Sequence, residues 1–462
     1  MKRSILAWRV APLLLAAGWA TGVSARDPYV LDIAVTNGQG GTETGTFGYS
    51  SIDEAIDRFD TSQLARDFNY GGFEQVDVDF DLRGIGAVLR FNQDATGLTF
   101  FINDVNIDPS DADGDGTNKV SFDGGSREAS IQLLKEFLKN NKSALRELLT
   151  AFARFSPIDP LAGNPDSLFS RRMRDDFSYG FTNKVSQIWG CGTSAFNTTN
   201  DAPIQVAAVG GVSDIFADAQ ARAAALQAQN EMGIGLLASS TTAKSAGGDY
   251  ATIGLVVPLS YTAKLDSDPR KKIRFDLPIT YTDTEGAVSY SLGAGLAYTH
   301  PLADEWSLTP AIGVGATGSE DLGSGGGLSA LSLTSAYTWR LDSFALSMGN
   351  SVGRYEALGL KFGDVEAEAD ISNTVFTNGF LLTGPNSLIA KNLVVEYSFV
   401  DTRITGDEVY ADAYDEIGIA LGHINTTMGV IDSYTKVGLS YLIADGAAGD
   451  ISSLRLNLSA RF

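Results

Sequence analysis

Histidine and cysteine, which carry much of the nucleophilic and metal chemistry of proteins, are scarce in this 462-residue chain. It contains two histidines, His300 and His423, and one cysteine, Cys191. Zinc sites that need two or three histidines are therefore nearly excluded, and an intrachain disulfide cannot form. A Ser–His hydrolase needs a histidine beside a serine and a carboxylate, and neither histidine adjoins a Gly-x-Ser-x-Gly turn. The sequence therefore favours a protein that is not an enzyme.

Three aspartates at alternate positions, Asp111, Asp113 and Asp115, directly precede Gly116. This spacing resembles the start of an EF-hand calcium loop, in which such carboxylates converge on the cation and glycine makes the turn. The pattern then departs from that loop, because Phe122 occupies the position of the bidentate glutamate. We expect an acidic turn between strands here, with weak calcium binding as the alternative. The sequence indicates no other metal or cofactor.

The charge balance restricts the partners of the chain. Lys and Arg total 34 against 56 Asp and Glu, which gives a formal net charge of -22. A surface of this sign repels phosphate backbones, so nucleic acid is excluded as a partner. Hydrophobic residues make up 44% of the chain, which is too apolar for a disordered protein.

Residues 1–25 have the pattern of a cleaved signal peptide. Lys2, Arg3 and Arg9 supply positive charge, residues 10–20 are apolar, and residues 23–25 read Val-Ser-Ala, a small-x-small cleavage site. The apolar stretch is shorter than the roughly 20 residues of a spanning helix, which makes a membrane anchor the weaker alternative. No other stretch could span as a helix, so a membrane-inserted mature chain must cross with strands.

Residues 232–462 alternate between apolar and small polar side chains. In the clearest stretch, Ile253, Leu255 and Tyr261 share one face, whereas Thr252 and Gly254 lie on the other. Small polar residues suit the inner wall of a barrel whose apolar stripe faces lipid. We therefore predict a 12-stranded antiparallel transmembrane β-barrel, with a soluble all-β fold as the alternative. The twelve predicted segments are 232–239, 250–265, 271–283, 287–302, 304–317, 328–341, 343–353, 366–382, 389–404, 411–424, 431–445 and 450–462.

The links between these segments alternate in length in a way that fits a barrel entered from the periplasm. Every second link is a short turn, such as Ala303 or Asp342. The two longest links, residues 318–327 and 354–365, both belong to the other set. Short periplasmic turns and longer external loops are typical of outer-membrane barrels.

The last segment ends with an apolar row and a terminal aromatic residue. Its members are Leu456, Leu458, Ala460 and Phe462. This ending resembles the outer-membrane insertion signal that the barrel-assembly machinery reads. Residues 212–231 precede the first segment and are predicted to form an Ala-rich helix, which Ser213 can cap. We expect this helix to lie in the barrel lumen, with a periplasmic linker helix as the alternative.

A helix, twelve strands and a terminal Phe462 together resemble the translocator domain of autotransporters, over roughly residues 212–462. The resemblance implies a barrel in the outer membrane of a Gram-negative bacterium and a preceding region carried outward through the lumen. It also implies contact with outer-membrane lipids and with the periplasmic export and barrel-assembly machinery. We expect a monomer. The preceding region lacks the repeats of a β-solenoid passenger.

The region before the barrel is predicted to be a small α+β domain, residues 26–155, followed by a linker, residues 156–211. Residues 127–140 and 142–155 form two amphipathic helices, which we expect to pack on a small sheet. Contact of this helix pair with the membrane is the alternative. The sequence leaves open whether residues 26–211 lie in the periplasm, in the lumen or on the surface.

These patterns predict an integral outer-membrane barrel that acts as a translocator or surface scaffold. A passive or selective porin-like channel is the first alternative. A surface adhesion protein and an outer-membrane phospholipase that uses His423 are the others. The sequence identifies neither a ligand nor a transported solute.

Overall fold

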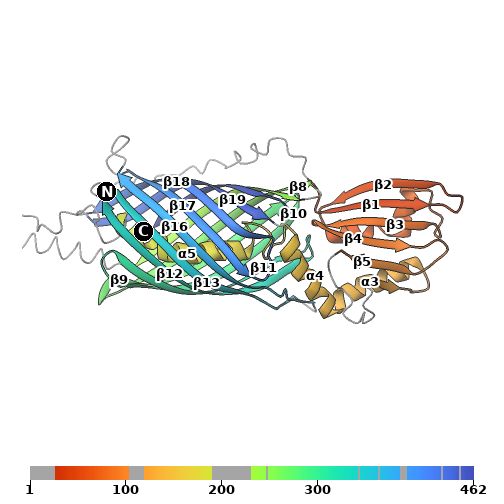
Figure 1. Cartoon of the computed structure of the whole chain (residues 1–462), viewed down its shortest axis with the longest axis horizontal. Coiled ribbons are helices and arrows are strands. Elements are labelled where there is room, and N and C mark those ends of the chain that lie inside the picture. The colour runs from red at the N-terminus through yellow and green to blue at the C-terminus, as the bar shows by residue number, and fades with distance from the viewer. Residues whose placement is uncertain are drawn as a thin grey trace, which may run out of the picture.

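The computed structural model describes residues 26–103, 119–189, 230–245, 248–341, 344–362, 365–385, 393–427, 430–446 and 449–461. They form a sheet with helices and a closed barrel, placed end to end (Figure 1). Three features predicted from the sequence lie outside the described residues: the signal peptide at residues 1–25, the Asp111–Asp113–Asp115 calcium candidate, and the predicted helix 212–231 apart from its last two residues.

The N-terminal domain is built on a six-stranded antiparallel sheet with the strand order β2-β1-β3-β4-β5-β6. Its strands are β1 (Tyr29–Thr36), β2 (Thr42–Tyr49), β3 (Gln75–Leu82), β4 (Ile85–Phe91), β5 (Leu98–Ile102) and β6 (Lys119–Phe122). Its helices are α1 (Ile52–Asp57), α2 (Thr61–Asp67), α3 (Arg127–Asn140) and α4 (Lys142–Phe155). The α+β class and the bounds of α3 and α4 agree with the prediction.

Alternation within the strands gives this sheet one apolar face. In β3, Val76, Val78 and Phe80 are buried, whereas Asp79 is exposed. The helices cover the apolar face, and Ile131 of α3 and Phe152 of α4 belong to the same buried cluster. Burial of apolar side chains between the sheet and the helices therefore stabilises the domain.

Serine and asparagine caps fix where the two long helices begin. The Ser126 side chain accepts a hydrogen bond from Ala129 N at 3.1 Å, and Asn141 accepts one from Ala144 N at 3.1 Å. Each cap satisfies one of the backbone donors left free in a first helical turn.

Residues 231–461 contain the barrel, whose twelve antiparallel strands close into a ring. They are β7 (Glu231–Ser245), β8 (Gly248–Leu265), β9 (Asp268–Thr284), β10 (Ala287–Pro301), β11 (Trp306–Ser319), β12 (Ser324–Leu341), β13 (Phe344–Leu358), β16 (Ser372–Pro385), β17 (Leu393–Gly406), β18 (Ala411–Thr427), β19 (Val430–Gly446) and β20 (Ile451–Arg461). Strand β20 pairs with β7 along a seam that runs from Ile451↔Ala243 to Arg461↔Gly233. The predicted 12-stranded barrel is confirmed, and closure leaves no unpaired strand edge.

The largest differences from the predicted strand boundaries are in β7 and β16, at six residues each. Strand β7 extends to Ser245, beyond the predicted residue 239, because the alternation continues with Ser239, Thr241 and Ala243 buried and Ser240 exposed. Strand β16 begins at Ser372, later than the predicted residue 366. A two-stranded hairpin, β14 (Leu360–Phe362) and β15 (Val365–Ala367), occupies the intervening link.

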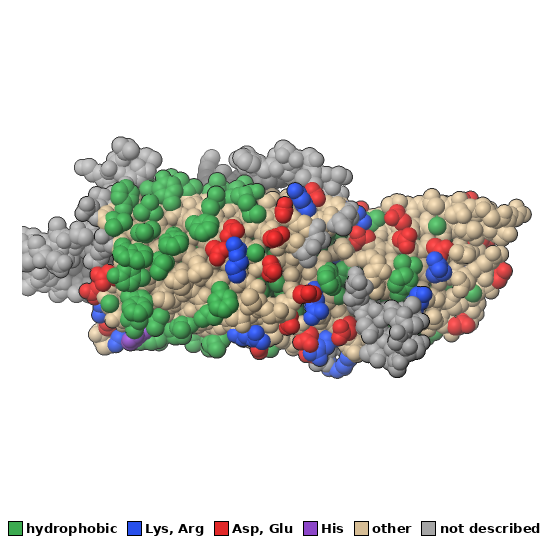
Figure 2. Space-filling view, in the orientation of Figure 1, with side chains coloured by type: hydrophobic (Ala, Val, Ile, Leu, Met, Phe, Trp, Pro, Cys, Tyr) green, Lys and Arg blue, Asp and Glu red, His purple; other side chains and the backbone are tan. Residues whose placement is uncertain are grey.

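The barrel exposes its apolar side chains on the outside. Along β8, Ile253 is 50% exposed, whereas Thr252 on the opposite face is 3% exposed. On the face drawn in Figure 2, apolar side chains gather in a belt over the part of the barrel away from the N-terminal domain. This is the outer surface of a membrane-spanning barrel, as predicted. No helix among the described residues is long and apolar enough to cross a membrane.

The N-terminal domain caps one mouth of the barrel. Ile52 N donates to Asp321 O at 2.9 Å, and Tyr410 N donates to Ala153 O at 3.2 Å. Arg26 N donates to Asp249 O at 3.3 Å. Residues 321, 410 and 249 lie at the ends of strands opposite to the start of β7 and the end of β20. The capped mouth is thus the one far from both strand termini.

Candidate functional site in the barrel lumen

A helix occupies the lumen of the barrel (Figure 1). It is α5 (Leu168–Trp189), whose side chains are described as far as Phe181. The segment expected as a linker, residues 156–211, therefore contains a 22-residue helix. The helix expected in the lumen, residues 212–231, lies outside the described residues apart from Asn230 and Glu231, the first residue of β7. The polar wall provides partners for the charged side chains of α5.

Phenylalanine and methionine side chains at every fourth position form one side of α5. They are Phe169, Met173, Phe177 and Phe181, and all four are buried. The rings of Phe177 and Phe181 stack at 4.9 Å. This side of the helix packs against a wall that includes Tyr355 of β13, whose ring lies 5.5 Å from that of Phe169.

Glycines in the wall make room for these rings. A Cβ added to Gly349 of β13 would lie 2.5 Å from Cδ2 of Phe181. At Gly379 of β16 it would lie 2.7 Å from Cζ of Phe177. Contacts this short are not tolerated between carbon atoms, so glycine is required where the helix approaches most closely.

The chain enters the lumen through a buried segment, residues 156–167, which we call the plug loop. Asp159 organises it: Oδ1 accepts from Leu161 N at 2.9 Å and from Ala162 N at 3.1 Å, while Oδ2 accepts from Ser324 Oγ of β12 at 2.8 Å. Arg83, in the β3–β4 turn of the N-terminal domain, lies 3.8 Å from Asp159 and 3.5 Å above the Phe152 ring. The N-terminal domain, the plug loop and the barrel wall therefore meet at the Asp159 carboxylate.

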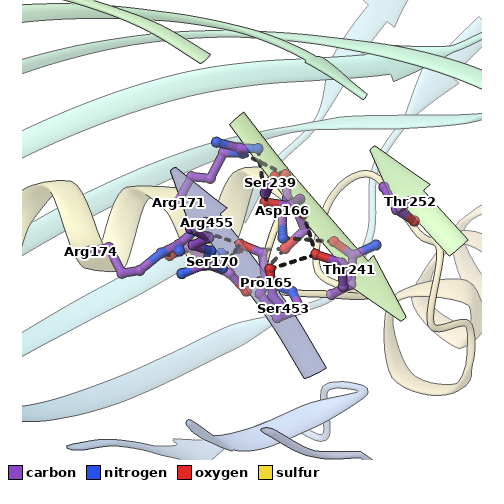
Figure 3. Close-up of polar contacts among 12 residues, drawn as sticks. Pro165, Asp166, Ser170, Arg171, Arg174, Ser239, Thr241, Thr252, Ser453 and Arg455 are labelled. Atoms are coloured by element: carbon purple, nitrogen blue, oxygen red, sulfur yellow. Dashed lines mark hydrogen bonds and ion pairs between the residues drawn. The ribbon is translucent and has the colours of Figure 1, made fainter. Parts of the chain in front are cut away.

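A second carboxylate of the plug loop bonds to the first barrel strand. Asp166 accepts hydrogen bonds from Ser239 Oγ at 2.9 Å and Thr241 Oγ1 at 2.6 Å, both on β7 (Figure 3). It also pairs with Arg171 of α5 at 2.9 Å. The side chain is buried, so these three partners replace the water that a carboxylate needs.

The last barrel strand contacts the same loop. Arg455 Nη2 of β20 donates to the Pro165 carbonyl at 3.3 Å, and Arg174 of α5 donates to that carbonyl as well (Figure 3). Thr241 of β7 and Ser453 of β20 share a hydrogen bond of 2.8 Å. The plug loop is thus bonded to both strands of the closing seam, from inside the lumen.

Further ion pairs lie inside the barrel, within α5, between α5 and the wall, and on the wall itself. Arg172 of α5 pairs with Asp176 and lies 3.4 Å from Asp276 of β9. Tyr355 Oη donates to Asp176 at 3.1 Å. On the wall itself, Lys436 pairs with Glu396 at 3.1 Å and Arg455 with Glu416 at 3.1 Å. The interior of the barrel is therefore a charged and largely paired network.

A cavity of about 400 Å³ remains beside α5. The helix contacts β10 to β13 and β16. The cavity lies between its other side and residues such as Pro258 of β8, Glu416 of β18 and Arg455 of β20. An off-centre helix thus leaves a space along one side of the lumen, lined by apolar and charged side chains.

At the capped mouth, an ion pair joins Arg26, at the start of the domain, to Asp81 of β3. Burial raises the pKa of Asp81 above its usual value, although a hydrogen bond from Gly84 N and the Arg26 guanidinium, 2.6 Å away, act in the opposite direction. Burial likewise raises the pKa of Tyr29. Both groups lie at the end of the sheet that faces the barrel.

The residues singled out from the sequence lie on the outer wall or outside the described residues. Leu456 and Leu458 are on the outward face of β20, with Ala460, whereas Phe462 is not described. His300 lies 3.3 Å from the Tyr298 hydroxyl, and His423 is exposed in the row of Ile419 and Leu421. Neither histidine lines the cavity. Among the described residues, no group of three or more His, Cys, Asp or Glu could hold a metal ion.

Sequence reasoning missed α5 and its charges. The signal that could have revealed it is the four-residue spacing from Phe169 to Phe181. The intervening run Arg171-Arg172-Met173-Arg174-Asp175-Asp176 hides this spacing, because it reads as a solvated segment.

No protein-family profile matches the sequence, and no curated protein sequence is similar to it. Solved structures do share the barrel. The translocator domain of autotransporter NalP from Neisseria meningitidis has 14% identity and a TM-score of 0.38, covering 54% of this chain and 97% of that one. The beta domain of the Bordetella autotransporter BrkA has 12% identity and a TM-score of 0.37, covering 50% and 98%. An outer-membrane channel from Pseudomonas putida F1 has 12% identity and a TM-score of 0.35, covering 50% and 94%. These TM-scores are below 0.5, so function has to be inferred from the geometry of this chain.

Proposed function

We propose that the chain is a surface scaffold in the outer membrane of a Gram-negative bacterium, whose barrel anchors residues 26–155 on the outside. One observation carries the proposal: the N-terminal domain caps the mouth opposite to the start of β7 and the end of β20, and α5 threads the lumen between them. The role is non-catalytic and needs outer-membrane lipids and the export and assembly machinery as partners. This role is supported by both histidines lying away from the lumenal cavity.

The distribution of side chains on the outer wall supports this orientation. Barrels of this class have short periplasmic turns, and the apolar belt lies toward the mouth where β7 begins (Figure 2). Toward the capped mouth the outer wall carries charges instead, including the pair Arg354–Glu356 at 3.2 Å and the pair Arg403–Asp415 at 3.3 Å. Charged side chains on this surface fit water, so that end projects beyond the membrane.

The threaded chain also supports a translocation step. Six strands spaced by about 4.8 Å make a sheet some 24 Å wide, whereas a helix with its side chains is about 10–12 Å across. A lumen that α5 largely fills has no room for the folded sheet. Residues 26–155 therefore cross as an unfolded chain and fold outside, and α5 is the segment that stays in the lumen.

The orientation is tested with two epitope tags in otherwise identical chains. One tag replaces the exposed β1–β2 turn around Gly40, which contacts no barrel residue. The matched control places the same tag at Asp304, in the exposed turn between β10 and β11 at the opposite mouth. On intact cells we expect antibody to bind the first tag, and to bind the second only after the outer membrane is permeabilised. The reverse pattern would reject the proposal, as would labelling of neither tag on intact cells.

A channel is the second candidate, and the cavity beside α5 is the observation that favours it. A channel predicts steady single-channel steps from the full chain in planar bilayers, and larger steps in a Phe177→Ala, Phe181→Ala double variant that thins the helix. A scaffold predicts that the capped full chain leaves the bilayer closed. Steady conductance by the full chain would replace the scaffold proposal with the channel.

A further inference from the structure

The cavity beside α5 is lined by both basic and acidic side chains. Six basic residues line it, against four acidic ones: Arg171, Arg172, Arg174, Arg274, Lys436 and Arg455, against Asp175, Asp276, Glu396 and Glu416. Asp166 and Asp176, which pair with Arg171 and Arg172, bring the acidic residues at its wall from four to six, so the charges balance in number. What distinguishes the site is how its individual basic side chains are paired.

Arg174 supplies charge that no carboxylate pairs with directly. Its guanidinium donates to Ser170 O at 3.3 Å and to Pro165 O, and no ion pair joins it to an acidic residue in the described part of the chain. Carbonyl groups accept hydrogen bonds but bring no net charge. Arg174 is partly exposed to the cavity, so the remaining donors of its guanidinium are available to a ligand.

Arg455 lies beside Arg174 and has an unused donor. Its side chain is 2% exposed, yet Nε is buried without a hydrogen-bond partner. Its other two nitrogens bond to Glu416 and to Pro165 O, the carbonyl that Arg174 also contacts. Two guanidinium groups therefore converge on one carbonyl oxygen at the wall of the cavity. A buried donor without a partner costs free energy that a ligand oxygen can recover.

We propose that this cavity binds a small oxyanion, a carboxylate or a phosphate, between Arg174 and Arg455. Guanidinium groups hold such anions through paired N–H···O⁻ hydrogen bonds, which are stronger in a low-dielectric interior than in water. A cavity of about 400 Å³ falls in the usual size range of small-molecule sites. The site lies on the lumenal side of the β7–β20 seam and is independent of whether the domain is displayed on the surface.

The experiment uses the purified full chain in detergent at low salt and measures binding by isothermal titration calorimetry. Inorganic phosphate and succinate are the anionic probes, and they separate the two ligand classes. Putrescine is the cationic control. We expect saturable binding of one or both anions, about one per chain, and no saturable binding of putrescine.

Arg174→Gln is the test variant, because it removes the charge without leaving a carboxylate unpaired. A charge-assisted hydrogen bond is worth enough that its loss weakens binding by about tenfold or more. Arg403→Gln is the matched control: it makes the same change on the outer wall, where Arg403 pairs with Asp401 at 2.6 Å and is half exposed. It should leave anion binding unchanged. Arg174→Lys keeps the charge but lacks the planar guanidinium that donates paired hydrogen bonds, so its affinity for the anions should be intermediate.

Three results would overturn the proposal. The full chain could bind neither phosphate nor succinate saturably. Arg174→Gln could bind them as tightly as the parent chain does. Putrescine could bind as well as the anions do. Unchanged heat-dependent gel mobility of each variant shows that the barrel has folded, so a loss of binding by Arg174→Gln reports on the site itself.

Discussion

Apolar and polar residues alternate along the strands of both the N-terminal sheet and the barrel, but the apolar face is buried in the sheet and exposed on the barrel. In β3, Val78 is buried and Asp79 is exposed to water, whereas in β10, Ser291 faces the lumen and Leu292 is 52% exposed on the outer wall. Alternation with a period of two therefore predicts strands, but it does not predict whether the apolar face packs into a protein core or faces lipid. What separates the two regions is the polar face, which is rich in Asp in the sheet and in Gly, Ser and Thr in the barrel.

The two regions also fill their interiors differently. The domain has a core of residues such as Leu89 and Phe91, each 1% exposed. The barrel interior instead holds buried charges. Asp166 pairs with Arg171 and accepts a hydrogen bond from the wall, and Arg455 donates to a carbonyl of the plug loop. Apolar burial stabilises the first interior, whereas the second depends on satisfying each buried charge.

The largest expected effect comes from removing one buried charge in the lumen. Asp166→Ala leaves Arg171 buried without its carboxylate and frees two hydroxyls of β7. We expect it to lower the free energy of unfolding by about 3–5 kcal/mol. Leu89→Ala in the domain core should cost a similar amount, about 2–5 kcal/mol, through loss of apolar contact. Urea unfolding in lipid vesicles measures both: tryptophan fluorescence and gel mobility follow the barrel, and tyrosine fluorescence follows the domain, because residues 26–155 contain no tryptophan.

Asp401→Ala is the control for this comparison, because Asp401 pairs with Arg403 on the half-exposed outer wall. Exposed pairs contribute about 0–1 kcal/mol, so the barrel should unfold nearly as the parent chain does. If Asp166→Ala were equally mild, the lumenal network would not act as the core of the barrel.

A smaller effect distinguishes the two faces of β10. Leu292→Lys puts a charge on the lipid-facing wall and should cost about 2–4 kcal/mol, with less of the protein inserted in the outer membrane. Ser291→Lys places the same residue in the lumenal cavity, and insertion should be nearly normal. In the N-terminal sheet, Asp79→Lys on the exposed face should change stability by no more than about 0.5 kcal/mol. Equal damage from Leu292→Lys and Ser291→Lys would mean that the two faces of the barrel have been assigned wrongly.

The sequence predicts the barrel well because its signal is regular and long. The twelve strands and the bounds of α3 and α4 follow from periodicity and from the Ser126 and Asn141 caps. The lumenal helix does not follow, because the charged residues of α5 that pair with the polar wall interrupt its apolar row and reduce the contrast on which helix prediction depends. The arginines of the proposed anion site were missed for the same reason. Arg455 reads only as a polar member of the last strand, and its convergence with Arg174 exists only once β20 closes onto β7.

The most direct test of the account is a pair of engineered disulfides in a Cys191→Ser background. Gly180→Cys with Thr334→Cys links α5 to β12, since a Cβ at Gly180 would lie 2.5 Å from Cβ of Thr334 and a slight shift brings the pair to disulfide geometry. Thr241→Cys with Ser453→Cys links β7 to β20, which are paired at these positions, and serves as the positive control. We predict that both bonds form in cells and that both proteins migrate faster on non-reducing gels. Formation of the β7–β20 bond without the α5–β12 bond would show a closed barrel with no helix seated in it, and would contradict the account.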